Sequence, residues 1–145
     1  MNSDLFSKLG LVLDHVAIAV SDLDQAQKVY EDIGFSFESE REVVESEGVQ
    51  TAFAQIDGHG HIELLTPVGE DGPIHKYLEK KGEGIHHICF RVKDVKAKCE
   101  ELAAKGYRLI HPEPKLGAKG CLVNFIHPKS TGGVLIEISQ QGAQA

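Results

Sequence analysis

Cysteine is scarce in this sequence. The 145 residues contain three cysteines, Cys89, Cys99 and Cys121. An odd number without a CxxC pair indicates neither a disulfide framework nor a structural zinc knuckle. We therefore expect a protein of a reducing compartment that is stabilised by a hydrophobic core. A chain of this length with 41% hydrophobic residues has the size of about one ordinary domain.

Long apolar runs and clusters of positive charge are also missing. There is no run of about eighteen apolar residues, and the opening MNSDLFSKLG has neither a basic start nor an apolar segment. The sequence therefore predicts a cytoplasmic protein without a membrane span or a targeting segment. The net charge is −7. Because nucleic acids and anionic membranes both require a basic surface, neither is an expected partner.

What the sequence does contain is an internal repeat. LDHVAIAVSDLDQAQKVYEDIGF, from Leu13, aligns without a gap with IHHICFRVKDVKAKCEELAAKGY at an offset of 72 residues. In each copy a β-prone segment is followed by an aspartate at a helix N-cap position, Asp22 or Asp94. A glycine, Gly34 or Gly106, then stands where the helix should end. Each copy therefore predicts a strand followed by a helix.

Three short β-prone segments follow each predicted helix. They are FSFESERE, VQTAFAQI and HIELLTP in the first copy, and YRLIHPE, CLVNFIH and GVLIEIS in the second. The sequence thus predicts one α+β domain over residues 1–145, built from two tandem βαβββ modules. Its expected parts are frayed residues 1–9, a first module at about 11–67, a linker at 68–84 with a short helix after Pro73, a second module at 85–139 and a tail at 140–145.

Each repeat places one histidine and one glutamate in matching positions. His15 and His87 lie near the start of the first strand, and Glu63 and Glu137 lie between apolar neighbours on the last. The histidine and the glutamate are 48 residues apart in one copy and 50 in the other. A pseudo-twofold arrangement would bring all four together around one divalent metal ion, with two carboxylates to balance its charge. Imidazole and carboxylate ligands suit Co, Mn, Ni, Zn or Fe.

The adjacent histidines of GIHHICF cannot both face the same side. Because alternate residues of a strand point to opposite sides, the register with the first repeat directs His87 inward. Cys89 and Arg91 share its face, whereas His86 points outward. A single histidine at a strand start is usually a packed or surface residue, but matching pairs in two repeats favour the metal. Cys89 is expected to be a core residue rather than a nucleophile.

The remaining histidines are weaker candidates. His59 and His61 flank the strand that carries Glu63, and His61 shares a face with it. His61 is therefore a possible additional ligand or a neighbour of the ligands. The other three are expected to be exposed, in a helix or beside prolines: His75, His111 and His127.

Three stretches carry a family resemblance: LDHVAIAVSDLDQA, HIELLTPVGEDGPIHKYLEKKGEGIHHICFRVKD and EPKLGAKGCLVNFIHPKSTGGVLIEIS. Over residues 11–139 the chain resembles the methylmalonyl-CoA epimerases of the vicinal oxygen chelate (glyoxalase-like) superfamily. The resemblance implies paired βαβββ modules that form a cupped, mostly antiparallel sheet around a metal, usually in a homodimer. It assigns the metal to the four residues that the repeat selects, His15, Glu63, His87 and Glu137.

The reaction implied by the resemblance is epimerisation of methylmalonyl-CoA, an acyl-CoA substrate, by removal and return of the α-proton. A metal that chelates the thioester and carboxylate oxygens would stabilise the enolate. Two acid/base groups are needed, and Glu137 is expected to be one of them as well as a ligand. Some family members have a second glutamate where this chain has Thr51, which lacks useful basicity and remains a substrate-binding candidate. The alternatives for the second group are Glu45, Glu47, Glu63, His61 and a metal-bound water.

The phosphates of coenzyme A require cations. The candidates are Lys115 and Lys119 in EPKLGAKG and Lys129 in HPKS, beside glycines that allow close approach of the backbone. The alternative interpretation is that they are ordinary solvated lysines on turns.

Two other functions use the same scaffold. One is a glyoxalase I type lyase or isomerase that acts on a glutathione hemithioacetal with the same four ligands. The other is a non-catalytic protein that binds or sequesters a small molecule; the four ligands argue against it, and Thr51 argues for it. A ring-cleaving dioxygenase is less favoured, because that branch typically uses three iron ligands.

Overall fold

A computed structural model describes residues 3–57 and 60–142. The chain forms two compact units: a first unit of His15–His86, and a second unit of Met1–Asp14 with His87–Ala145. The boundaries fall inside two strands, β1 (Leu11–Ala19) and β5 (Gly84–Val92). The first residues of each of these strands therefore belong to a different unit from the rest of the strand.

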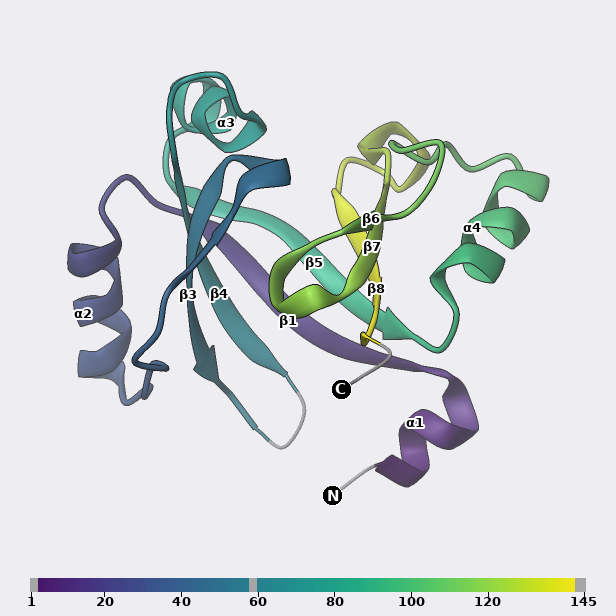
Figure 1. The fold of residues 1–145 in the computed structure, drawn as a ribbon, viewed down its shortest axis with the longest axis horizontal. Coiled ribbons are helices and arrows are strands. Elements are labelled where there is room, and N and C mark those ends of the chain that lie inside the picture. The colour runs from purple at the N-terminus through teal and green to yellow at the C-terminus, as the bar shows by residue number, and fades with distance from the viewer. Residues whose placement is uncertain (1–2, 58–59, 143–145) are drawn as a thin grey trace. The chain divides into compact units, whose positions relative to one another are not determined.

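The first unit contains α2 (Leu23–Ile33), β2 (Glu42–Val44), the 3₁₀ turn η1 (Glu45–Glu47), β3 (Val49–Gln55), β4 (His61–Pro67) and α3 (Pro73–Lys81). Its strands lie in the order β2-β3-β4-β1. The β1–β4 pair is parallel, and the other two pairs are antiparallel. Helix α2 packs against one face of this sheet (Figure 1). The core between them includes Val20, Leu23, Ala52, Ile62 and Leu64.

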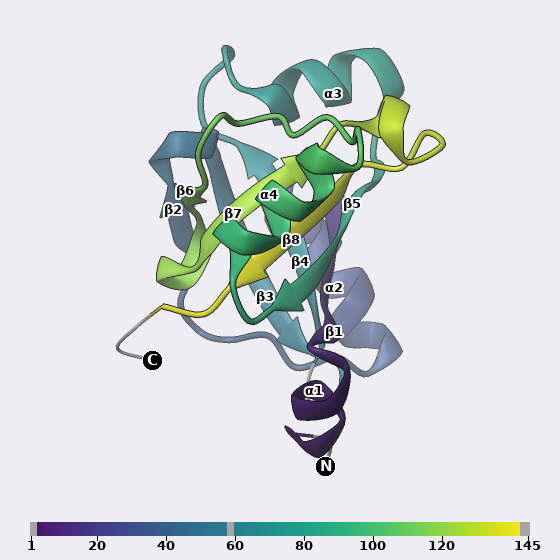
Figure 2. The ribbon, with the colours of Figure 1, turned by 90° about the vertical axis from the view of Figure 1, so that its right-hand side faces the viewer.

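The second unit contains α1 (Ser3–Leu9), α4 (Val95–Ala104), β6 (Lys115–Leu116), η2 (Ala118–Gly120), β7 (Leu122–Ile126), η3 (Pro128–Ser130) and β8 (Ile136–Gln140). Its strand order is β5-β8-β7-β6, with β5 and β8 parallel and the other pairs antiparallel. Helix α4 lies across β7 and β8 (Figure 2). The core under it includes Val92, Val95 and Ile138. The strand order and pairing directions of the first unit thus recur, which confirms the predicted βαβββ repeat.

The helix signals that the sequence repeats are present in the structure. The Asp22 carboxylate accepts from the Gln25 backbone N–H at 3.1 Å, and the Asp94 carboxylate accepts from Ala97 at 3.0 Å. Gly34 follows α2 with φ 131°, a conformation that side chains disfavour. These caps mark where each helix begins and where α2 ends.

Three expectations about the elements were wrong. Residues 3–9 form a helix rather than a frayed end, and Lys93 Nζ donates to the Ser7 carbonyl at 3.0 Å. The strands expected over FSFESERE and YRLIHPE are also absent. In their place the structure has isolated β-bridges, Phe37 with Ala54 ahead of the short β2 and Leu109 with Ile126 ahead of the short β6. Serine and glutamate disfavour strands, and the prolines of HPEP have no N–H to donate to a ladder.

Candidate active site

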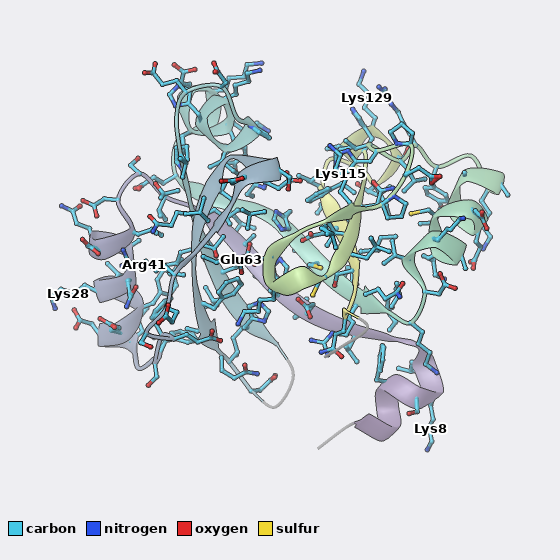
Figure 3. The ribbon with its side chains drawn as sticks, viewed as in Figure 1. Lys8, Lys28, Arg41, Glu63, Lys115 and Lys129 are labelled. Carbon is cyan, nitrogen blue, oxygen red and sulfur yellow. The ribbon has the colours of Figure 1, made fainter. Side chains whose placement is uncertain are left out.

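The first unit presents His15 and Glu63 on the sheet face opposite the core that packs against α2. Figure 3 shows Glu63 on this face. Strand register pairs His15 with His61 and Ala17 with Glu63, so these four side chains share a face. His15 and Glu63 are each 6% exposed, and the Nε2 of His15 lies 3.6 Å from Oε2 of Glu63. The sheet therefore holds an imidazole and a carboxylate in direct contact and away from water.

His61 joins this pair. The ligand atoms of His15, His61 and Glu63 all lie within 4.8 Å of one another. The rings of His15 and His61 are stacked, with centroids 5.0 Å apart and an interplanar angle of 29°. The sequence placed His61 on the correct face, but its contact with His15 depends on strand register. His59 lies outside the described residues.

The second unit repeats the pair. His87 is 5% exposed and Glu137 is 8% exposed, and Nε2 of His87 lies 3.0 Å from Oε1 of Glu137. The ring of Phe125 meets the imidazole of His87 edge-on, with centroids 5.4 Å apart. Because His87 is buried and His86 is only half-buried, the alternation expected for the two histidines is confirmed.

The buried donors suit a divalent cation. A carboxylate loses solvation free energy on burial and needs positive charge nearby. Each unit supplies such a carboxylate together with an imidazole, and neither pair includes a thiolate. Nitrogen and oxygen donors of this kind are typical of Mn, Co, Ni and Zn sites. The structure thus provides groups able to bind a metal within each unit.

Thr51 is fully buried, on the same face of β3 as Phe53, which lies opposite Glu63 in the strand register. Its hydroxyl donates to the backbone carbonyl of Glu42 at 3.3 Å. A hydroxyl engaged in this way packs the sheet edge and supplies no basic group. Its proposed contact with substrate remains a prediction.

The three lysines predicted to bind phosphate are exposed and lie on separate segments of the second unit: Lys115 on β6, Lys119 in η2 and Lys129 in η3. Figure 3 shows Lys129 extending outward from its turn. Lys119 has φ 58°, a left-handed conformation that residues other than glycine rarely adopt. Their role in binding remains a prediction.

Sequence reasoning missed the hydrogen bonds of Asn124. This side chain is 1% exposed; its amide nitrogen donates to the His111 carbonyl and to the Cys99 thiol, and its oxygen accepts from the His111 N–H. Burial raises the pKa of the Cys99 thiol, and burial followed by the charge of Lys115 lowers the pKa of His111. A buried asparagine on β7 between apolar residues was the one signal in the sequence for this network.

The other expectations about side chains had mixed outcomes. Cys89 is fully buried and its thiol lies 3.3 Å from the Ser139 hydroxyl, as a core residue should. The three histidines expected to be exposed are instead half-buried. One of them, His127, also accepts a hydrogen bond from the Lys129 backbone N–H. Arg91 donates to the Asp14 carboxylate at 2.6 and 3.0 Å, a pairing across 77 residues that no local pattern predicts.

Comparison with known proteins agrees with this fold. Residues 14–125 match the model of the Glyoxalase/Bleomycin resistance protein/Dioxygenase superfamily. A mitochondrial methylmalonyl-CoA epimerase of Mus musculus is 42% identical over 134 residues, which are 92% of this chain and 74% of the relative. An ethylmalonyl-CoA/methylmalonyl-CoA epimerase of Cereibacter sphaeroides is 41% identical over 130 residues, covering 88% of this chain and 96% of the relative.

Solved structures give the same result. A variant of the Streptomyces coelicolor methylmalonyl-CoA epimerase in complex with 2-nitronate-propionyl-CoA has a TM-score of 0.86 and 38% sequence identity, and the match covers 90% of this chain and 97% of that one. The chain belongs to the superfamily of the matching model and, within it, to the methylmalonyl-CoA epimerase family. The family resemblance and the α+β fold expected from the sequence are confirmed. The family is one of enzymes, which argues against a purely sequestering role.

Proposed function

We propose that His15, Glu63, His87 and Glu137 hold one divalent metal ion and that the protein uses it to epimerise methylmalonyl-CoA. The observation that carries the proposal is the buried imidazole–carboxylate pair found once in each unit. When bound, the cation would act as a Lewis acid toward the negative charge that develops on the substrate oxygens. Co, Mn, Ni and Zn are the candidate metals, because all four accept imidazole and carboxylate ligands.

Glu137 is proposed to move the proton. Its carboxylate is buried, so its charge is weakly screened, and the contact of Oε1 with His87 restrains its orientation. Epimerisation at one carbon removes a proton from one face and returns it to the other, so a second group must face Glu137 across the substrate. Thr51 does not supply that group, because its hydroxyl lacks basicity and bonds to the Glu42 carbonyl.

The substrate is proposed to be an acyl-CoA thioester whose α-carbon also bears a carboxylate. The Streptomyces coelicolor structure contains a CoA thioester analogue, and the Cereibacter sphaeroides relative is named for both ethylmalonyl and methylmalonyl thioesters. Lys115, Lys119 and Lys129 are proposed to contact the phosphates, since all three are exposed cations on turns and edges of the second unit.

Deuterium exchange tests this function. Wild-type protein incubated with methylmalonyl-CoA in deuterated buffer should incorporate deuterium at the α-carbon, detected by mass spectrometry. Glu137→Gln should slow incorporation by about 100-fold or more, because it removes a proton-transfer group. Thr51→Ala should slow it far less, because the hydroxyl supplies no proton-transfer group. Glutathione hemithioacetal serves as the competing substrate. If the protein converts the hemithioacetal and shows no deuterium exchange with methylmalonyl-CoA, the glyoxalase I type reaction is favoured.

We further propose a cytoplasmic homodimer that does not bind nucleic acid or membranes. None of the helices in the described part of the chain is both long and apolar enough to cross a membrane. The net charge of −7 argues against polyanionic partners. Light scattering of the purified protein measures its mass, and a monomer would contradict the dimer.

A further inference from the structure

His61 breaks the symmetry of the repeat. The residue two positions before Glu63 is His61, whereas the residue two positions before Glu137 is Leu135. The first unit thus carries a third nitrogen or oxygen donor on its site face, and the second unit has an aliphatic side chain in the matching place. The four-ligand set does not use His61, so its presence beside His15 requires a separate explanation.

The rings of three residues form a row across neighbouring strands. His15 on β1 stacks on His61 on β4 at 5.0 Å, and the ring of Phe53 on β3 meets His61 edge-on at 5.2 Å with an interplanar angle of 62°. His61 is only half-buried, whereas His15 is 6% exposed. The ring of His61 is therefore in contact with Phe53 on one side and covers the imidazole of His15 on the other.

A metal-binding imidazole needs a fixed ring orientation. Hydrogen-bond partners of a ligating histidine supply this restraint, and their loss typically weakens metal binding by about 10- to 100-fold. A ring stacked on the imidazole restrains the same rotation by packing. In the second unit, Phe125 meets His87 directly and edge-on. In the first unit, His61 makes an aromatic contact with His15.

We propose that His61 is a positioning residue that orients His15 for metal binding through ring stacking. This inference rests on the metal site of the proposed function. In this role the imidazole acts as an aromatic surface, and no bond from its nitrogens to the metal is needed. Two kinds of variant should therefore differ in metal binding: an aromatic ring at position 61 should preserve it, and an aliphatic side chain should weaken it.

Binding of Co²⁺ to the metal-depleted protein tests the proposal, by competition with a chelator and by the visible spectrum of the bound ion. His61→Leu, which introduces the residue of the second unit, should weaken Co²⁺ binding by about 10-fold, whereas His61→Phe should stay within about twofold of wild type. His86→Leu is the matched control, because His86 also contacts an aromatic ring, that of Tyr77, but lies outside the four-ligand set. It should not change the affinity.

Three results would overturn the inference. Equal losses in His61→Phe and His61→Leu, with a changed Co²⁺ spectrum, would show that His61 is itself a ligand. Wild-type affinity in His61→Leu would show that the stack has no role. A thermal midpoint of metal-free His61→Leu well below that of His61→Phe would show a structural role instead. Failure of the wild-type protein to bind Co²⁺ would contradict the metal site itself, which distinguishes the loss of the proposed function from the loss of this inference alone.

Discussion

Asn124 is a polar residue in the core of the second unit, and it stabilises the fold through hydrogen bonds to backbone groups. Asn124→Ala would leave the N–H and the carbonyl of His111 without this partner. Each buried polar group left unpaired costs about 1–3 kcal/mol, so we expect the free energy of unfolding to fall by about 3 kcal/mol. Urea denaturation followed by circular dichroism measures the change.

Ser130→Ala is the control for that experiment. The Ser130 hydroxyl also accepts from a loop N–H, that of Arg108, at 3.0 Å, but this bond is exposed and water can replace it. The loss should be about 1 kcal/mol or less. Equal losses in the two variants would show that burial of the Asn124 network does not matter.

His111 is the second residue with a measurable signature. Burial, and then the charge of Lys115, lowers the pKa of its imidazole, and Nε2 finds no hydrogen-bond partner among the described residues. In the unfolded chain the histidine titrates at about pH 6.5. Below that pH the unfolded state therefore binds a proton more readily than the folded state does. Stability due to this group is therefore complete above the unfolded pKa and is lost as the pH falls toward the folded pKa.

His111→Phe should flatten this dependence, since phenylalanine keeps a ring against Phe125 and does not titrate. The free energy of unfolding of wild-type protein should fall more than that of the variant between pH 8 and about pH 5.5. Urea titrations at several pH values measure both slopes. His75→Gln, in α3, controls for the loss of one histidine. Parallel slopes in wild type and His111→Phe would contradict the assignment.

At the scale of the elements, the two helix caps offer a matched pair. Asp22→Ala and Asp94→Ala each remove a carboxylate that accepts a backbone N–H at the start of a helix. Each change should cost about 1 kcal/mol of stability. Asp32→Ala, which removes only an exposed ion pair with Lys28, should cost less than about 0.5 kcal/mol. Thermal unfolding of the three variants ranks them, and an equal effect in all three would contradict a capping role.

The elements also show why sequence reasoning succeeds where it does. The β1–α2 and β5–α4 segments could be predicted because apolar runs, cap aspartates and closing glycines are local signals that occur twice. Helix α1 escaped prediction because it is short, and Phe6 and Ser7 contact Lys93, far away in the sequence. The Asp14–Arg91 pair escaped for the same reason. Duplication made the histidine–glutamate pairs predictable, whereas the stack of His61 on His15 depends on the register of two strands.

For the molecule as a whole, metal binding should add stability. A ligand that binds only the folded state at 100 times its dissociation constant stabilises it by about 2.7 kcal/mol. Adding Co²⁺ to the metal-depleted protein should therefore raise the thermal midpoint, and EDTA should reverse the rise. His15→Ala and His87→Ala should each abolish the rise, because the proposed site needs a ligand from each unit. Retention of the full rise in either variant would contradict a shared metal.

The border between the two compact units falls between Asp14 and His15 in β1, so the protein cannot be cut into these units at the linker. A cut in the linker after α3 would leave the Asp14 carboxylate on one fragment and its cationic partner Arg91 on the other, although both belong to the same compact unit. The sequence repeat and the folded units therefore do not share their borders. A fragment made from either half of the sequence would therefore carry one member of this ion pair without the other.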